Sequence, residues 1–130
     1  MPYHYRIDRR PGCVILKGWG KVSLSDLLAH IKQILKGKSL PCPYKHIIDF
    51  REVTEYYITS DDVFKLKNEL NRYGKKMKNP RIAVLASSDQ MYDTSKITDA
   101  ITVGGYEVKG FKVADKAIEF LDIVAPPNWI

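Results

Sequence analysis

The hydrophobic residues near the start of the chain form a short apolar run that follows a weakly alternating segment. Residues 13–16 are continuously apolar and come directly after a turn-forming Pro-Gly pair, which predicts a buried strand. Residues 3–8 alternate weakly between polar and apolar types and predict a strand on the other side of that turn. We therefore expect an antiparallel hairpin whose second strand ends at residues 18–20.

The clearest helix is predicted over residues 23–36. Its apolar positions recur at the 3.6-residue helical spacing and define one stripe, which comprises Leu24, Leu27, Leu28, Ile31, Ile34 and Leu35. Ser23 with Asp26 three residues later predicts a capped N-terminus, and Gly37 is typical of the position just past a helix.

The same two patterns repeat along the rest of the chain. Further strands are predicted at residues 45–50, 81–86 and 106–111, with a short β-prone segment at 53–58. Further helices are predicted from Ser60 to a stop at Gly74, over roughly 91–103, and over 114–121. The order β-β-α-β-α-β-α-β-α predicts an α/β fold, with a mostly parallel five-stranded sheet, an N-terminal antiparallel hairpin and about four helices.

The length of the chain limits how many domains it can form. Its 130 residues suffice for one hydrophobic core and are too few for two ordinary domains. We expect residues 1–124 to form a single α/β domain and residues 125–130 a C-terminal tail. No apolar run is long enough to span a membrane, the first residues lack a secretory pattern, and two cysteines exclude a disulfide scaffold. A soluble cytoplasmic protein is therefore expected.

The net charge of +6 is distributed unevenly along the sequence. The basic excess lies in the first 80 residues, whereas the last 50 residues carry more acids than bases. An electropositive surface is one feature of nucleic-acid-binding proteins. However, several lysines stand at predicted helix ends, where they complement the negative end of the helix dipole. No aromatic residues alternate with them as stacking platforms would. Nucleic acid is therefore expected to be an unlikely partner.

Catalytic and metal-binding patterns are missing from the sequence. The three histidines, His4, His30 and His46, have no recognised metal-ligand spacing, and Cys42 has no neighbouring cation to activate it. The glycine-rich segment at 18–23 does not match a phosphate-binding loop. Asp49 lacks the acidic pair of a phosphorylated receiver domain and is expected to pair with Arg51. We expect no catalytic residues, no metal, no cofactor and no enzymatic activity.

Thr59 and Ser60 stand at the start of a predicted helix and allow two interpretations. Either hydroxyl can cap the helix, and the aspartates that follow, Asp61 and Asp62, favour its positive end. Alternatively, an exposed hydroxyl at this place can accept a phosphate, although the two neighbouring carboxylates would repel it. From the residues alone, the cap is the favoured interpretation.

Aromatic side chains and a methionine gather near the same end of the predicted sheet. Tyr57 precedes the helix that Ser60 opens, Phe64 lies off the main apolar stripe of that helix, and Met91 and Tyr92 open the next one. Ligands of α/β folds bind at the carboxyl ends of the strands. These four residues are therefore a candidate apolar pocket, with ordinary core packing or a dimer patch as alternatives.

Four segments carry a resemblance to a known family. Residues 46–53, the helix start at 58–62, residues 81–85 and residues 111–121, together with the order of elements, resemble the bacterial STAS-like family. Within it, the sequence is most similar to small stand-alone proteins related to anti-sigma-factor antagonists and to the lipid-binding CRAL-TRIO lobe. The resemblance extends over about residues 3–122.

The resemblance implies two roles. In the regulatory branch, a partner kinase that also sequesters a sigma factor phosphorylates a serine at the start of the second helix, a place that Ser60, or secondarily Thr59, holds here. The family's preceding Asp and following Gly are replaced by Ile58 and Asp61. The other branch binds small nonpolar molecules, which agrees better with the aromatic group. The leading hypothesis is a regulatory module that binds a small apolar ligand or a protein partner. The alternative is an anti-sigma-factor antagonist controlled through Ser60.

Overall fold

The computed structural model describes residues 3–8, 12–37, 40–41, 43–74, 77, 80–87, 99 and 106–124. Within them lie the strands β1 (Tyr3–Asp8), β2 (Cys13–Ser23), β3 (Lys45–Tyr57), β4 (Arg81–Leu85) and β5 (Glu107–Phe111). The helices are α1 (Leu24–Leu35), α2 (Ser60–Gly74) and α4 (Ala114–Leu121). The helix expected over 91–103, apart from residue 99, and the tail at 125–130 fall outside the described residues.

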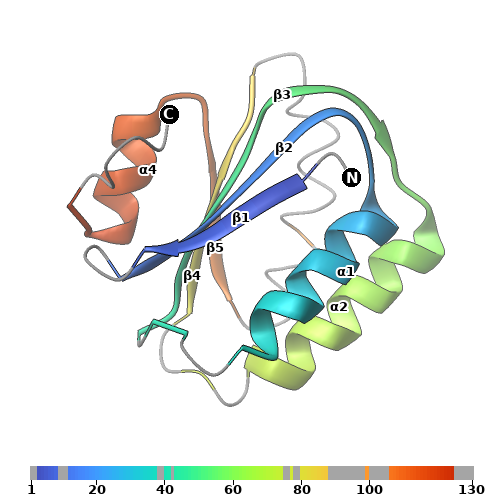
Figure 1. The fold of residues 1–130 in the computed structure, drawn as a ribbon, viewed down its shortest axis with the longest axis horizontal. Coiled ribbons are helices and arrows are strands. Elements are labelled where there is room, and N and C mark those ends of the chain that lie inside the picture. Colours follow the sequence, from blue (N-terminus) through green and yellow to red (C-terminus); the bar gives the residue numbers. More distant parts are fainter. Residues whose placement is uncertain are drawn as a thin grey trace.

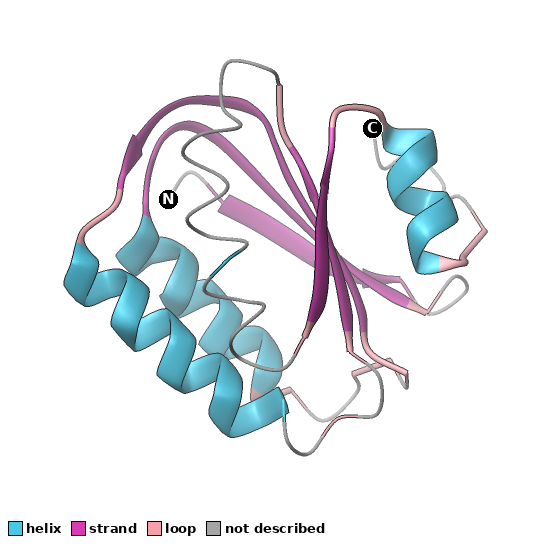
Figure 2. Ribbon diagram, turned by 180° about the vertical axis from the view of Figure 1, so that it is seen from behind, coloured by secondary structure: helices cyan, strands magenta, loops and turns pink. Residues whose placement is uncertain are grey.

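The five strands form one sheet in the order β1-β2-β3-β4-β5 (Figure 1). β1 and β2 pair antiparallel, whereas β3, β4 and β5 each pair parallel with the strand before them. The fold class predicted from the order of hydrophobic segments is therefore confirmed. The helices lie on both sides of the sheet, with α1 and α2 side by side on one face and α4 on the other (Figure 2).

The start and end of α1 follow the sequence signals. Ser23 is the N-cap, and its hydroxyl oxygen accepts a hydrogen bond of 3.1 Å from the backbone N–H of Asp26. At the other end, the backbone N–H of Gly37 donates to the carbonyl of Ile34 over 3.0 Å. All six stripe residues are buried, so the helical periodicity correctly identified the face that packs on the sheet.

The sheet separates two hydrophobic clusters of unequal size. The larger one lies under α1 and α2 and includes Leu27, Ile31 and Phe50, all buried. The smaller one lies under α4 and combines strand residues such as Ile47 with Ala117 and Leu121 of the helix. Burying a Leu, Ile or Phe side chain contributes roughly 1.5–3 kcal/mol, so the α1–α2 side supplies most of the hydrophobic stabilisation.

Two sequence-based boundaries are corrected by the structure. β2 does not end at residues 18–20 but continues to Ser23, and the β-prone segment at 53–58 belongs to one long β3. From Lys17 to Ser23, β2 advances six residues, whereas β3 advances eight, from Asp49 to Tyr57. The two register shifts are bulges that bend the paired strands over the helices (Figure 2). We call residues 17–23 and 49–57 the arm.

Glycines allow β2 to continue through the arm. A Cβ atom on Gly18 would lie 3.1 Å from Tyr3 Cε1 and 3.3 Å from the Phe50 ring, so two aromatic side chains pack directly on the Gly18 backbone. Gly20 has φ +64°, in the left-handed region that favours glycine. The glycines that predicted the end of a strand therefore allow it to bend and continue, because β3 supplies its hydrogen-bonding partner.

Candidate functional site

The arm leads directly into α2, and Thr59 caps that helix. The Thr59 hydroxyl oxygen accepts a hydrogen bond of 3.1 Å from the Asp62 backbone N–H, and its carbonyl accepts one of 3.1 Å from the Val63 N–H. Both bonds are those of an N-cap residue. Ser60 is then the first residue of α2, and its exposed hydroxyl makes no hydrogen bond within the described part of the chain.

Charges around Ser60 are partly neutralised. Asp61 Oδ2 accepts an ion-paired hydrogen bond from Lys65 Nζ at 3.0 Å, across one turn of α2. The hydrogen bond to Asp61 raises the pKa of Lys65. Asp62 lies in the same first turn, where its charge favours the positive end of the helix. Lys65 therefore reduces the repulsion that a second negative group beside Asp61 would meet.

Two of the four residues expected to line a pocket are described, and both are on the surface. Tyr57 at the end of β3 is 50% exposed, and Phe64 in the second turn of α2 is 61% exposed. Met91 and Tyr92 lie outside the described residues. Phe64 and Ser60 are four residues apart, so they occupy the same side of α2. The structure thus places Tyr57 and Phe64 beside the helix start that Thr59 and Ser60 form.

Packing requirements do not explain the exposed position of Phe64. The face of α2 that meets the core is built from Leu66 and Leu70, which are buried, with Val63 and Tyr73 partly buried against the same cluster. Phe64 faces away from this stripe, as its position off the apolar periodicity predicted. A phenylalanine that is mostly exposed gains little of the hydrophobic stabilisation that full burial provides.

The outer face of the arm carries charges and aromatic rings. Lys17 pairs with Glu52 at 3.1 Å and Lys21 pairs with Glu55 at 3.8 Å, and between these ion pairs Trp19 is 41% exposed. A hydrogen bond to Glu55 raises the pKa of Tyr57. This surface did not emerge from the sequence, because it depends on the bulged pairing of β2 with β3. The β-prone residue types over 53–58 were its only sequence signal.

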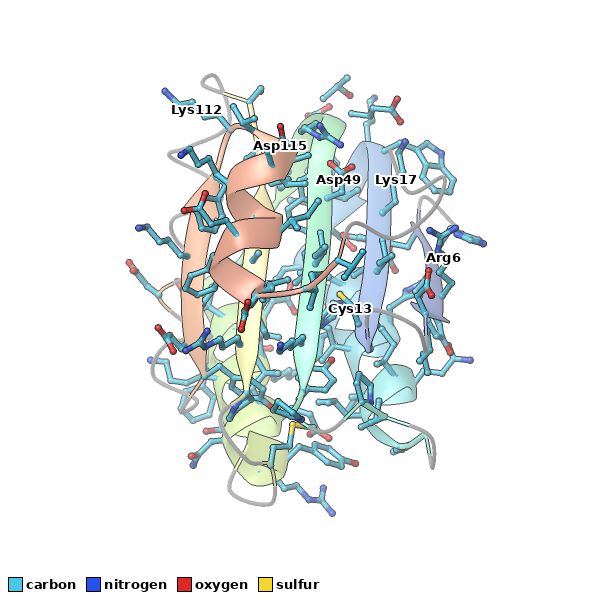
Figure 3. The ribbon with its side chains drawn as sticks, turned by 90° about the vertical axis from the view of Figure 1, so that its left-hand side faces the viewer. Arg6, Cys13, Lys17, Asp49, Lys112 and Asp115 are labelled. Carbon is cyan, nitrogen blue, oxygen red and sulfur yellow. The ribbon has the colours of Figure 1, made fainter. Side chains whose placement is uncertain are left out.

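Asp49 and Arg51 form the expected ion pair. Asp49 Oδ1 accepts from both the backbone N–H and the Nε of Arg51, each at 3.0 Å, and Oδ2 accepts from Nη2 at 2.9 Å. Figure 3 shows Asp49 beside Lys17 of β2, on the face that carries α4. Asp49 lies within β3 and does not end it, which corrects the sequence-based boundary. Its carboxylate is thus committed to a structural pair.

The buried histidines also have structural surroundings. His30 Nδ1 lies 3.0 Å from the Asp26 carbonyl, and the His30 ring centroid lies 5.0 Å from that of Tyr3. His46 Nδ1 hydrogen-bonds the Tyr44 hydroxyl at 2.9 Å, whereas its buried Nε2 has no hydrogen-bond partner among the described residues. Burial lowers the pKa of His46 to about 3. His46 is therefore neutral near pH 7.

A metal site needs several His, Cys, Asp or Glu side chains close together, and a thiol nucleophile needs a cysteine that ionises near neutral pH. Among the described residues, no three His, Cys, Asp or Glu side chains gather in a metal-binding arrangement. Cys13 is buried and its pKa is raised to about 12 by that burial, so its thiol stays protonated at neutral pH. Cys42 lies outside the described residues. No described helix is long and apolar enough to cross a membrane.

Comparisons with known proteins identify the fold. No protein-family model matches the sequence, and no curated protein matches it either. The structure is similar to that of an uncharacterized protein of the DUF3478 family from Shewanella loihica, which has a SpoIIAA-like fold. The two chains are 20% identical, the match covers 92% of this chain and 93% of the other, and the TM-score is 0.58. The chain therefore has a SpoIIAA-like α/β fold, as the STAS-like resemblance implied.

Proposed function

We propose that this SpoIIAA-like domain is a non-enzymatic module that binds a protein partner at the start of α2. The single observation that supports the proposal is the exposure of Tyr57 and Phe64 on either side of the Thr59–Ser60 helix start. Aromatic side chains are enriched at the centres of protein interfaces and often provide most of the binding energy. Exposed positions suit a flat partner surface better than an enclosed small ligand.

The proposal is tested with paired variants of the exposed aromatic residues. Proteins retained by the immobilised chain from the source organism's extract are identified by mass spectrometry, and the candidate partner is then purified and titrated. Phe64→Ala is expected to weaken binding at least about tenfold, as loss of a central aromatic contact does. Val124→Ala, which alters an exposed apolar side chain elsewhere, is the matched control and should leave the affinity unchanged. Equal affinity of the Phe64 variant and the control would refute the proposal.

A small apolar ligand is the alternative binding partner for the exposed aromatic residues Tyr57 and Phe64. Native mass spectrometry of protein purified directly from cells tests it without knowledge of the ligand. If the protein carries a lipid-like adduct that disappears in a Tyr57→Ala, Phe64→Ala double variant, the surface binds a small molecule and the protein-binding proposal is wrong. Protein that carries no adduct, together with a partner lost in Phe64→Ala, supports the protein-binding function.

A second candidate function is control of this surface by phosphorylation of Ser60. The observation that favours it is the division of roles between the two hydroxyls: Thr59 makes the capping hydrogen bond, so the Ser60 hydroxyl has no capping role to lose. A phosphate there would meet the positive end of α2, with Asp61 already paired to Lys65. It would also place about two negative charges next to Phe64 and so alter partner binding.

The two hydroxyls make this candidate testable. Ser60→Ala is expected to abolish phosphate incorporation by candidate kinases while the free energy of unfolding stays nearly unchanged. Thr59→Ala removes the cap and is expected to cost about 1 kcal/mol of stability, with phosphorylation retained. Phosphate incorporation that persists in Ser60→Ala, or partner binding that is the same with and without the phosphate, would rule the switch out.

Charge alone remains the only support for nucleic acid as a partner. Lys17, Lys21 and Lys65 are each paired with a carboxylate, which reduces the free positive charge of the arm and of α2. If lysine charge provided the binding energy, the affinity for nucleic acid would fall steeply as the salt concentration rises. Absence of any oligonucleotide binding at low salt would exclude it.

A further inference from the structure

The strand β5 forms one edge of the sheet. Among the described strands it pairs with β4 alone, in continuous register from Glu107 to Phe111 and without a bulge. Figure 3 shows β5, in orange, at the margin of the sheet beside α4. The unpaired side of an edge strand presents N–H and C=O groups that can bond to another chain. β5 therefore has backbone groups available for one further strand.

The hydrogen bonds at the two ends of β5 show which residues have these free groups. The Glu107 N–H donates to a carbonyl just before β4, and the Phe111 carbonyl accepts from an N–H just after β4, each at 3.0 Å. In a parallel ladder every second residue directs both its N–H and its C=O to the same neighbour. Residues 107, 109 and 111 therefore bond to β4, and Val108 and Gly110 direct their backbone groups away from it.

Gly110 makes this free edge accessible. The residue is exposed, and it has no side chain that would keep a second backbone at a distance. Glycine inside a strand often marks a bulge or a place where another backbone approaches closely, and the β4–β5 register has no bulge. Val108 is half-buried against the core under α1 and α2. An added antiparallel strand would exchange two hydrogen bonds with Val108 and two with Gly110.

The side chains on the α4 side of β5 leave a positive charge uncompensated. Glu107 Oε2 accepts from Arg81 Nε at 3.1 Å, so the acid of this strand is already paired. Lys109 is exposed, its Nζ lies 5.7 Å from the centroid of the Phe111 ring, and no carboxylate in the described part of the chain pairs with it. Lys112, which follows β5, is exposed as well. The free charge at this edge is therefore positive.

Lys109 decides which strand this edge accepts. Beside an added antiparallel strand it forms a pair without hydrogen bonds, in which the two Cα atoms lie about 4.5 Å apart and the side chains are closest. An acidic residue opposite the lysine is attracted, whereas a basic residue is repelled. Lysine on a short edge strand otherwise disfavours pairing. The other edge strand, β1, does not discriminate in this way, because its Arg6 Nη2 and Asp8 Oδ2 lie 3.8 Å apart and compensate each other.

We propose that β5 binds an extended segment of a partner protein as an additional antiparallel strand, with a glutamate or aspartate of that segment opposite Lys109. The backbone bonds to Val108 and Gly110 provide affinity for an extended chain, and the acidic residue provides specificity. This inference goes beyond the proposed function, since it uses the edge of the sheet and no residue at the start of α2.

Peptide titrations followed by NMR test the site and its charge preference. The probe is a short, capped, threonine-rich peptide with one central glutamate, and its controls carry glutamine or lysine in place of the glutamate. On addition of the probe, the amide signals of Val108 and Gly110 are expected to shift downfield and their hydrogens to exchange more slowly. The glutamine peptide should bind up to about fivefold more weakly, and the lysine peptide more weakly still. In Lys109→Glu the order of the glutamate and lysine peptides should reverse.

Variants of Gly110 test the backbone contact. Gly110→Pro removes the N–H that faces away from β4, and edge strands tolerate proline where the N–H faces solvent, so the fold should persist while peptide binding is lost. Gly110→Ala keeps the N–H and is the matched control that should retain binding. Circular dichroism and thermal unfolding show whether each variant is folded, and the charge reversal at Lys109 tests the proposal independently of them.

Three results would overturn the proposal. They are unchanged Val108 and Gly110 signals up to millimolar peptide, equal affinity for the glutamate and lysine peptides, and undiminished binding to folded Gly110→Pro. Self-association of the protein that Gly110→Pro abolishes would assign this edge to a second copy of the chain instead. Phe64→Ala should bind the peptide as the unaltered protein does, so failure at β5 and failure at the start of α2 are distinguishable.

Discussion

His46 shows how one buried side chain can set a protein's response to acid. It is buried in the core, and its Nδ1 hydrogen-bonds the Tyr44 hydroxyl at 2.9 Å, while no group in the described part of the chain pairs with its Nε2. Burial is the cause of its lowered pKa, about 3 against an ordinary value of 6.5. A protonated imidazole would therefore have to be buried with one N–H unsatisfied, which is costly.

Stability is predicted to fall as the pH drops below about 6.5. Between pH 6.5 and 3 the unfolded chain binds a proton at His46 and the folded chain does not, so protonation favours unfolding. At pH 4.5 this corresponds to a loss of about 3 kcal/mol relative to neutral pH. Urea titrations at pH 7.5, 6, 5 and 4.5 measure the free energy of unfolding at each pH and so test this loss.

Two variants identify His46 as the source of this pH dependence. His46→Gln keeps a hydrogen-bonding group for Tyr44 but cannot titrate, so the slope between pH 6.5 and 4.5 should flatten. Tyr44→Phe removes the hydrogen bond and keeps the burial, so the slope should persist because desolvation is its cause. A His46→Gln variant with the full acid sensitivity would place the effect elsewhere.

At the level of elements, the arm connects the sheet to the proposed binding surface. Its bulges place Tyr57 at the end of β3, where α2 begins. Tyr3 helps to fix this geometry, since its ring packs against Gly18 and its hydroxyl donates to the Ser23 carbonyl over 3.3 Å. The local sequence of the arm is thus adapted to close packing and not to ending a strand.

Two glycine substitutions are predicted to destabilise the arm for different reasons. In Gly18→Ala, the new Cβ atom meets the confined rings of Tyr3 and Phe50, and overpacking of this kind costs about 1–3 kcal/mol. In Gly20→Ala, no atom of the described residues lies within 4 Å of the new Cβ atom, so the cost comes from the left-handed φ, about 1–2 kcal/mol. Chemical denaturation measures the free energy of unfolding of both variants.

Substitution by asparagine distinguishes overpacking at Gly18 from the left-handed φ at Gly20 as the cause of destabilisation. Gly20→Asn should be milder than Gly20→Ala, since asparagine tolerates positive φ. Gly18→Asn should be worse than Gly18→Ala, because the larger side chain increases the clash. Equal costs for Ala and Asn at both positions would contradict this assignment.

At the scale of the whole molecule, the two faces of the sheet are covered unequally. The α1–α2 face buries many large aliphatic and aromatic side chains. On the other face, α4 contributes mainly Ala114, Ala117 and Leu121 to its cluster. Arg81 adds a link at the C-terminal end of α4, since its Nη1 donates to the Phe120 carbonyl over 3.2 Å.

Local opening is predicted to start at α4. Eight residues with small buried side chains supply less hydrophobic stabilisation than the twelve residues of α1, so α4 should open with a lower free energy than global unfolding. Native-state hydrogen exchange is expected to show faster exchange in α4 than in α1. Leu121→Ala should accelerate exchange in α4 more than in α1, and equal protection of both helices would disprove the prediction.

The candidate site was only partly accessible to prediction. Thr59 and Ser60 were recognised at the helix start because capping depends on local residue types, but their separate roles were not, since either hydroxyl can reach the same N–H groups. The off-stripe position of Phe64 was visible in the helical periodicity. The charged face of the arm was not, because cross-strand contacts such as Lys21 with Glu55 depend on register.

Interactions between residues that are near in sequence therefore determined much of this protein's secondary structure. Hydrophobic spacing located α1 and its buried face, the strand–helix order gave the α/β class, and the Ser23 cap was identified to the residue. Tertiary structure decided what depends on distant partners: β2 continues through its glycines because β3 lies beside it, Asp49 falls within a strand, and His46 loses its charge to burial. Periodicity reports which face of an element is apolar, whereas length, register and desolvation are fixed only when other elements pack against it.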